Sequence, residues 1–358
     1  MTEFEQRRRA AADRLSGAKV DALLVSSPPN VRYLSGYSGS NGLMLVTAAD
    51  EWFFTDPRYG EEASATITCH VQVCQGPLMK AAAALAKRNK LKRIGIEPSW
   101  LRLGDYYELQ QAMGPGVELK PVPGAVEALR AVKSPGEIAK IRNSVRVSSE
   151  AFSRTLNRIR PGVRENQIAA EIDFQMRVLG AEKNAFDSIV AAGPRSALPH
   201  AHPTTHPLGP NELVLIDIGA MVGGYASDMT RVACIGTPPK RIREIYKAVA
   251  EAQLAALDAV RPGVPVSKVD AAARQVLKGH GLEKQFVHST GHGLGLEIHE
   301  PPKIGKGEKM RLQVGMVITI EPGAYVAGFA GVRIEDTVLV TERGCQIITQ
   351  TPKKLFLL

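Results

Sequence analysis

The chain has few cysteines, few aromatic residues and no long apolar run, and each shortage excludes a class of protein. Its 358 residues include four cysteines, whose positions show neither a disulfide framework nor the spacing of a zinc site. No run of about 18 uncharged apolar residues is present, so we expect no membrane span. The first residues lack the apolar core of a secretory signal, and we therefore expect a cytoplasmic protein with reduced thiols.

The excess of positive charge comes without the features of a nucleic-acid-binding surface. The formal net charge is +9, but the basic residues are scattered in short clusters along the chain. Aromatic residues, which would stack on bases, make up only 5% of the chain. We therefore expect a solvated basic surface and no nucleic-acid partner.

The hydrophobic pattern predicts an α/β protein with two domains. Proline and glycine cluster at 121–124, which places a boundary there and predicts domains over 1–123 and 124–358. A turn is predicted at 27–30, and no chemistry-bearing set of residues is visible before the boundary. Strands of the first domain are predicted at 20–25, 43–47, 51–54, 67–74, 92–96 and 117–121, and helices at 3–16, 78–89 and 101–112.

The second domain contains two copies of one pattern. The motif RPGV at 160–163 recurs at 261–264, and the motif GxEK at 180–183 recurs at 281–284, both with an offset of 101 residues. Each copy runs through a helix, a turn, a second helix and a second turn into strands. Each copy also finishes in a hairpin that carries two acidic residues. The repeat predicts an internal duplication about a pseudo-two-fold axis.

Four carboxylates lie in the otherwise apolar strands of these hairpins. A carboxylate is costly to bury there unless a cation or strong hydrogen-bond donors meet it. The first pair is equidistant from Val222-Gly223, which predicts that the two side chains face each other across an antiparallel pair. The second pair is equidistant from Gly328. The pairs are Asp217 with Asp228, and Glu321 with Glu335.

A histidine in a glycine-rich turn accompanies the carboxylates. His292 lies in the segment 291–295, whose glycines are not followed by the Lys-Ser/Thr of a phosphate loop. Four carboxylates and one imidazole form an oxygen-rich ligand set that suits Mn²⁺, Fe²⁺ or Co²⁺. Two such ions, about 3.5–4 Å apart, would acidify a shared water to give a nucleophile. The residues therefore predict a two-metal hydrolytic site.

This set resembles the pita-bread metallopeptidases, which include aminopeptidase P, prolidase, methionine aminopeptidase and the metal-free creatinases. The ligand order Asp, Asp, His, Glu, Glu is intact, and the resemblance covers essentially the whole chain. It implies a creatinase-like α/β domain before a pita-bread catalytic domain. It also implies a homodimer with two divalent ions, Mn²⁺ first, and Co²⁺, Fe²⁺ or Zn²⁺ as alternatives. By this resemblance Asp217 binds one ion, His292 and Glu321 bind the other, and Asp228 and Glu335 bridge them.

The same resemblance implies roles for residues outside the ligand set. Glu321 doubles as the general base for the attacking water, and His200 donates to the substrate near the scissile bond. His299 stabilises the oxyanion. Arg333 orients Asp217, as partners of metal ligands commonly do. The implied substrate-contacting or pocket residues are His288, Tyr325 and Phe186.

The N-terminal domain separates this chain from methionine aminopeptidase, which resembles only the second half. Segments 30–36 and 54–59 look like those of the proline-directed branch, whose Xaa-Pro substrates have a tertiary amide without an N–H. Short microbial prolidases place an arginine after the HExP segment, but this chain has Lys303, which lacks the bidentate fork. We therefore expect an aminopeptidase P acting on peptides with proline at the second position, with prolidase, an Xaa-Pro dipeptidase, as the alternative. A metal-free peptide-binding relative or a creatinase-like hydrolase is disfavoured because all five ligands are present.

Overall fold

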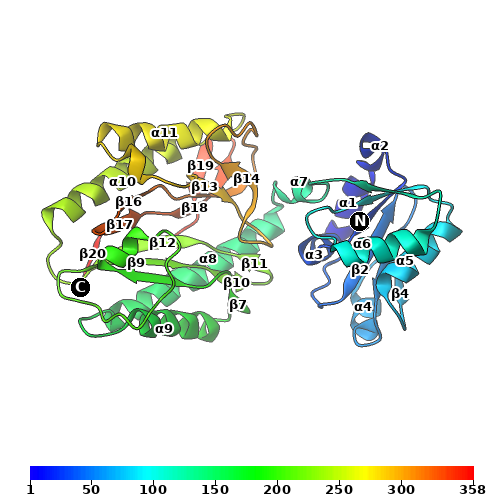
Figure 1. The fold of residues 1–358 in the computed structure, drawn as a ribbon, viewed down its shortest axis with the longest axis horizontal. Helices are drawn as coiled ribbons and strands as arrows, with labels where there is room; N and C mark the ends of the chain where they lie inside the picture. Colours follow the sequence, from blue (N-terminus) through cyan, green and yellow to red (C-terminus); the bar gives the residue numbers. More distant parts are fainter. The chain divides into compact units, whose positions relative to one another are not determined.

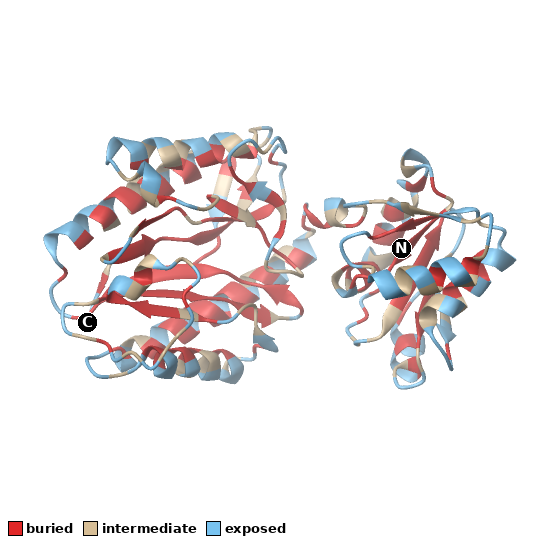
Figure 2. Ribbon diagram, viewed as in Figure 1, coloured by how far each residue is buried: buried red, intermediate tan, exposed pale blue.

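The computed structural model describes residues 1–358, which divide into the compact units Met1–Arg130 and Ala131–Leu358. Each unit has its own core, and Figure 2 shows that the strands and the inner faces of the helices are the buried parts. None of the helices has the length and apolar character needed to cross a membrane. All four cysteines are free thiols.

The first unit is a six-stranded mixed sheet with helices packed on it. Its strands are β1 Ala22–Val25, β2 Gly42–Thr47, β3 Glu51–Thr55, β4 His70–Val73, β5 Arg93–Ile96 and β6 Glu118–Pro121. Its helices are α1 Glu3–Ala12, α2 Leu15–Ala18, α3 Pro28–Ser35, α4 Gly60–Thr66, α5 Leu78–Arg88, α6 Leu103–Met113 and α7 Glu127–Arg130. The sheet order is β4-β3-β2-β1-β5-β6, and β1 is buried along its whole length because it lies between two neighbours.

The predicted turn at 27–30 is wrong. Ser27 is the N-cap of α3, and Pro28 and Pro29 lie in the first turn of that helix. A proline is well suited there because the first helical N–H groups have no partner within the helix. The proline pair therefore starts a helix at this place and does not end one.

The second unit places a helix pair on each side of its strands (Figure 1). The helices are α8 Pro135–Thr155, α9 Glu165–Val178, α10 Lys240–Ala259 and α11 Val266–Gly279, with 3₁₀ turns η1 Leu156–Arg158, η2 Gly193–Ala197 and η3 Glu283–Gln285. The strands of its first half are β7 Lys183–Asn184, β8 Ile189–Ala192, β9 Leu213–Ile218, β10 Ala220–Val222, β11 Tyr225–Ala226 and β12 Met229–Cys234. Those of its second half are β13 Gly291–Gly293, β14 Glu300–Ile304, β15 Val317–Ile320, β16 Gly323–Val326, β17 Ala330–Arg333, β18 Asp336–Thr341, β19 Gly344–Ile347 and β20 Phe356–Leu357.

Local sequence explains where the first long helix of this unit begins. The Ser134 hydroxyl accepts a hydrogen bond from the Glu137 N–H, and the Glu137 carboxylate accepts one from the Ser134 N–H at 2.9 Å. This reciprocal capping box, followed by Pro135 in the first turn, fixes the start of α8. The helix then buries an apolar face against the strands, which positions the first half of the unit.

The predicted duplication is confirmed by the order and pairing of the elements. In the first half, α8 and α9 precede β8, which pairs antiparallel with β9. In the second half, α10 and α11 precede β13, which pairs antiparallel with β15. The main sheets are β20-β12-β9-β8 and β14-β13-β15-β18-β19. The hairpins that carry the acidic residues therefore come from equivalent places in the two halves.

The first acidic hairpin differs in register from its prediction. Gly223 and Gly224 both have positive φ, 59° and 79°, as a tight two-residue turn requires, so the hairpin is centred between them. Asp217 consequently lies opposite Thr230 and not opposite Asp228. Since the shift amounts to two residues, both carboxylates still lie on the same face of the strand pair.

The second acidic hairpin has the predicted register. The ladders between β15 and β18 and between β16 and β17 are both centred on Gly328. Pro322, which has no N–H to donate, lies between the two ladders and interrupts the pairing. Glu321 and Glu335 lie at this interruption, where the side chains turn into the interior of the unit.

Candidate metal centre

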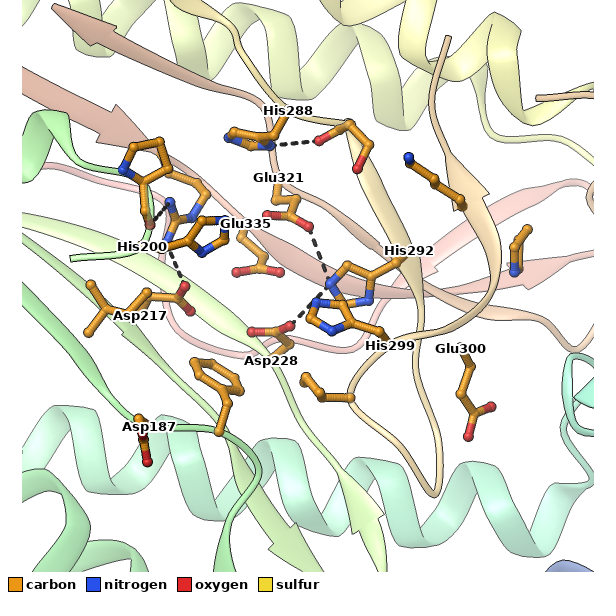
Figure 3. A pocket seen from close by; sticks show the side chains of 18 of the residues that line it. Asp187, His200, Asp217, Asp228, His288, His292, His299, Glu300, Glu321 and Glu335 are labelled. Atoms are coloured by element: carbon orange, nitrogen blue, oxygen red, sulfur yellow. Dashed lines mark hydrogen bonds and ion pairs between the residues drawn. The ribbon is translucent and has the colours of Figure 1, made fainter. Parts of the chain in front are cut away.

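The four carboxylates and the histidine converge on one cavity of about 840 Å³ in the second unit, as Figure 3 shows. Metal-binding atoms of Asp228, His292 and Glu335 all lie within 4.8 Å of one another. The His292 Nε2 atom is 3.5 Å from Asp228 Oδ2 and 3.3 Å from Glu321 Oε1. Asp217 also lines the cavity, so the structure brings together all five predicted ligands.

Glycines allow the histidine-bearing strand to fit between its neighbours. A Cβ atom on Gly291 would collide with the Thr319 carbonyl, and one on Gly293 would collide with the Pro301 carbonyl. Only glycine therefore permits β13 to approach both β14 and β15 so closely. The close packing places the His292 side chain against the carboxylates of β15 and of the first hairpin.

The hydrogen bonding of His292 orients it as a metal ligand. Its Nδ1 atom is 3.0 Å from the Gly293 carbonyl oxygen, which can only accept, so Nδ1 carries the proton. In the neutral ring the Nε2 lone pair then points toward Asp228 and Glu321. Histidines that bind metals are commonly held through their other ring nitrogen in this way.

Two buried carboxylate oxygens fit a bound cation. Asp217 Oδ1 and Glu335 Oε1 are both buried without a hydrogen-bond partner. The second oxygen of Asp217 accepts from Arg333, and that of Glu335 accepts from Thr230 at 2.8 Å. Buried polar atoms rarely lack partners, and hard divalent cations prefer carboxylate oxygens. The residues present therefore fit divalent metal ions.

Electrostatic repulsion within the cluster favours the same conclusion. Burial, then the charges of Glu335 and Asp217, raise the pKa of Asp228 well above its usual range. Burial, then the charges of Glu321 and Asp217, do the same to the pKa of Glu335. Burial also opposes ionisation of Glu321, but in the metal-free protein the hydrogen bond and charge of protonated His292 lower its pKa to about 2. Divalent cations would remove the repulsion that raises the first two pKa values.

Two threonines that the sequence analysis missed support the carboxylates. The Thr230 hydroxyl contacts Glu335 and accepts from Arg333 Nε at 2.9 Å. The Thr319 hydroxyl donates to Glu321 Oε1 at 3.2 Å. Each threonine lies two residues from an acidic ligand, on the same strand face, and this spacing could have identified them.

A hydrogen-bonded chain runs from Asp217 to His288 behind the cavity wall. Arg333 contacts Asp217 with one nitrogen and donates to the Tyr325 hydroxyl with another at 2.7 Å. That hydroxyl is 2.8 Å from His288 Nε2, and His288 Nδ1 is 2.7 Å from the Ser289 carbonyl oxygen. Burial raises the pKa of Tyr325 to about 12, so its hydroxyl stays protonated and donates a hydrogen bond to His288 Nε2. Tyr325 therefore connects Arg333 to His288 without lining the cavity, whereas Arg333 and His288 do line it.

The other predicted residues also lie at the cavity. His200, His299 and Phe186 line it, together with His202, which the sequence did not single out. The His299 ring packs edge-on against His292, with 4.3 Å between the ring centroids. Burial, and then the charge of His292, lower the pKa of His299, so this ring is neutral at neutral pH. A neutral imidazole retains one N–H for donation.

Two ion pairs near the cavity were not anticipated either. Arg274 pairs with Asp270 at 2.7 Å and donates to the His288 carbonyl oxygen at 2.6 Å. Lys133 pairs with Glu300, the residue after His299, at 3.2 Å. The Lys133–Glu300 pair joins segments that are distant in the sequence, so no local spacing indicates it. The Arg274–Asp270 pair has the i,i+4 spacing of one helix, which could have identified it.

The profile of metallopeptidase family M24 matches residues 139–342, and that of the creatinase/prolidase N-terminal domain matches residues 7–132. The chain is 36% identical over 336 residues to a Pyrococcus furiosus protein named Xaa-Pro dipeptidase. That match covers 94% of this chain and 95% of the other.

Two solved structures resemble the chain over almost its whole length. The Xaa-Pro dipeptidase from Bacillus anthracis has a TM-score of 0.97 and 35% identity, covering 99% of this chain and 100% of that one. The X-Pro aminopeptidase from Thermotoga maritima has a TM-score of 0.90 and 35% identity, covering 97% and 99%. The predicted fold, a creatinase-like domain before a pita-bread domain, is confirmed by these matches.

Proposed function

Because the chain belongs to metallopeptidase family M24, we propose that it is an Xaa-Pro dipeptidase that works with two divalent metal ions. The observation that carries the proposal is the convergence of five ligand side chains on one cavity. The names of similar proteins favour the dipeptidase over the aminopeptidase P that the sequence analysis expected. The dipeptidase was the alternative at that stage, and it is now the preferred function.

The proposed ligand arrangement follows the family order. Asp217 would hold one ion, His292 and Glu321 would hold the other, and Asp228 and Glu335 would bridge them. The oxygen-rich set makes Mn²⁺ the first candidate. When bound, such ions supply Lewis acidity that polarises a carbonyl and acidifies water.

The protein's own side chains would then handle the protons. The Glu321 carboxylate accepts a proton from the attacking water, as a general base does. The leaving ring nitrogen of proline has no N–H and must receive a proton, and His200, which lines the cavity, would donate near the scissile bond. His299 offers an N–H to the oxygen that becomes negatively charged.

A cationic side chain at the cavity could pair with the carboxylate of a dipeptide substrate. The proline of a dipeptide ends in a free carboxylate, which needs a cation or strong donors when it enters the site. Lys303 lines the cavity and carries an ammonium group with three donors. Its place matches that of the arginine in short microbial prolidases, although it binds as a point charge without the bidentate fork.

One comparison of substrates tests this function. The Mn²⁺-reconstituted protein should hydrolyse Xaa-Pro dipeptides and leave Xaa-Pro-Xaa peptides intact. The metal-free protein serves as the control and should hydrolyse neither. Equal or faster cleavage of the longer peptides would instead assign aminopeptidase P, which the similarity to the Thermotoga maritima structure keeps as the second candidate.

Two further features stay predictions. The first is a homodimer, which light scattering after gel filtration would detect as twice the mass of one chain. The second is the cytoplasmic location, which fractionation of the source cells would test.

A further inference from the structure

Glu165, outside the metal cluster, is a carboxylate with no solvent exposure at all. It lies in the first turn of α9 and accepts hydrogen bonds from three residues. The donors are the Ala192 N–H at 2.8 Å, the Thr204 N–H at 2.9 Å, the Thr204 hydroxyl at 2.7 Å, and Arg195 Nε at 3.1 and 3.0 Å to the two oxygens. Every group that contacts this carboxylate through these bonds is a donor, so the site requires an ionised acceptor.

These donors lie on both sides of His200 in the loop that connects β8 to β9. Ala192 is the last residue of β8 and Thr204 lies four residues after His200, so one carboxylate joins the two sides of the segment between them. Arg195 extends the contact, because its Nη2 donates to the His202 carbonyl oxygen at 2.7 Å. The Glu165 carboxylate and Arg195 therefore contact the chain on both sides of His200.

Other contacts hold only the middle of this loop. Ser196 accepts from the Gly331 N–H at 2.8 Å, and the Pro199 carbonyl oxygen accepts from Arg333 at 3.3 Å. Both contacts precede His200 in the sequence. After His200, the Ala201 N–H donates to the Leu198 carbonyl oxygen at 3.2 Å, and the Glu165 carboxylate and its partner Arg195 hold the N–H and hydroxyl of Thr204 and the carbonyl of His202.

Backbone contacts at the same place do not depend on the Glu165 side chain. The Glu165 N–H donates to the His206 carbonyl oxygen at 3.1 Å, and the Asn166 N–H donates to the Thr204 carbonyl oxygen at 3.0 Å. A substitution of the carboxylate leaves these bonds in place. The start of α9 should therefore stay docked on Thr204 and His206, and the segment between Ala192 and Thr204 should loosen.

We propose that Glu165 is a positioning residue that sets the place of His200 at the cavity. The inference rests on the proposed function, in which His200 donates to the substrate. Glu165 does not line the cavity and so acts through the loop and not on the substrate.

The variant Glu165→Gln tests this role while keeping the shape of the side chain. Its NH₂ group must face one of the donors, so at least one end of the loop is released. We expect kcat to fall about 10- to 100-fold, as misplacement of a catalytic group by about 1 Å does, with KM and metal content unchanged. The matched control is Glu150→Gln, which removes an exposed ion pair with Arg154 on α8 and should keep full activity.

A double variant separates positioning from general damage. If Glu165 acts through His200, adding Glu165→Gln to His200→Ala should cause no further loss of kcat. A loss that multiplies with that of His200→Ala, or an unchanged kcat in Glu165→Gln alone, would overturn the proposal. If Glu165→Gln fails to fold, Thr204→Val removes one donor and should show a smaller loss with the same dependence on His200.

Hydrogen exchange without substrate distinguishes failure of this inference from failure of the proposed function. In Glu165→Gln the amides of Ala192 and Thr204 should exchange faster than in the unsubstituted protein, while those of β15 stay protected. Unchanged exchange at both amides would contradict the positioning role of Glu165, whatever the substrate. If these amides exchange faster in Glu165→Gln but the unsubstituted protein cleaves no Xaa-Pro peptide, the positioning role would be supported and the proposed function rejected.

Discussion

The two halves of the second unit place β8 and β13 in equivalent positions, each paired with the first acidic strand of its half. Ala192 of the first half corresponds to Gly293 of the second, because each pairs at the same place in its sheet. One residue earlier, the first half has Ala191 and the second half has His292. The first half therefore contributes two carboxylates to the centre, and the second contributes two carboxylates and an imidazole.

This difference shows how a duplicated fold becomes a site with two unequal ends. Asp217 and Glu321 occupy equivalent strand positions, but Arg333 contacts the first and Thr319 contacts the second. The duplicated fold gives each half two carboxylates in equivalent positions. The two halves differ in the neighbouring strand, which carries Ala191 in β8 and His292 in β13. We infer that the half with the histidine also provides the base.

The largest expected effect is at the base. Glu321→Gln removes the proton acceptor while keeping the length of the side chain, so kcat should fall by about 10²–10⁴-fold. Circular dichroism should show an unchanged fold. Turnover like that of the unsubstituted protein would exclude Glu321 as the base and remove this functional difference between the halves.

A second variant makes the two halves alike at the position of the histidine. His292→Ala gives the second half the residue type that the first half has at Ala191. Since changes behind metal ligands already cost about 10- to 100-fold in affinity or activity, loss of the ligand itself should cost more. Elemental analysis should find fewer ions per chain than in the unsubstituted protein.

A histidine away from the cavity provides the control for that variant. His280 caps the end of α11 and contacts Glu251 at 2.7 Å. His280→Ala should retain both the metal and the activity. If it lost metal to the same extent as His292→Ala, the role of His292 as a ligand would lose its support.

A smaller effect is expected in the stability of the protein as pH changes. Asp228 and Glu335, one from each half, have raised pKa values in the folded metal-free state. The folded state then binds more protons than the unfolded state, so its free energy of unfolding falls as pH rises from the ordinary carboxyl range to the raised pKa values. Bound metal ions would remove this loss of stability, because they neutralise the ionised carboxylates. The gain in Tm on adding Mn²⁺ should therefore be larger at about pH 8 than at about pH 5.5; a gain that shrinks as pH rises would contradict this account.

The sequence predicts the second hairpin better than the first for a physical reason. Glu321 and Glu335 are equidistant from Gly328, and the ladders on both sides of Pro322 keep that register. In the first hairpin the turn is fixed by the two glycines with positive φ, which lie one residue beyond the predicted centre. The two aspartates of the first hairpin nevertheless lie on one face, as predicted, because an even shift preserves the face on which side chains lie.

The sequence alone could not predict the contacts that support the site. Glu165 accepts hydrogen bonds from Ala192 and Thr204, which lie 27 and 39 residues later, and Arg333 contacts Asp217 from 116 residues away. Such partners depend on how the elements pack and on no local spacing. The choice between dipeptidase and aminopeptidase was also beyond the sequence, because Lys303 provides a charge without the geometry that separates the two substrates.

The most direct test of the central claim is the number of metal ions per chain. The protein is stripped with a chelator, dialysed against Mn²⁺ and analysed by elemental mass spectrometry, with Asp228→Asn as the comparison. We predict two ions per chain in the unsubstituted protein and fewer in Asp228→Asn, because that side chain is a proposed bridge between the ions. No bound ions in the unsubstituted protein would contradict the account.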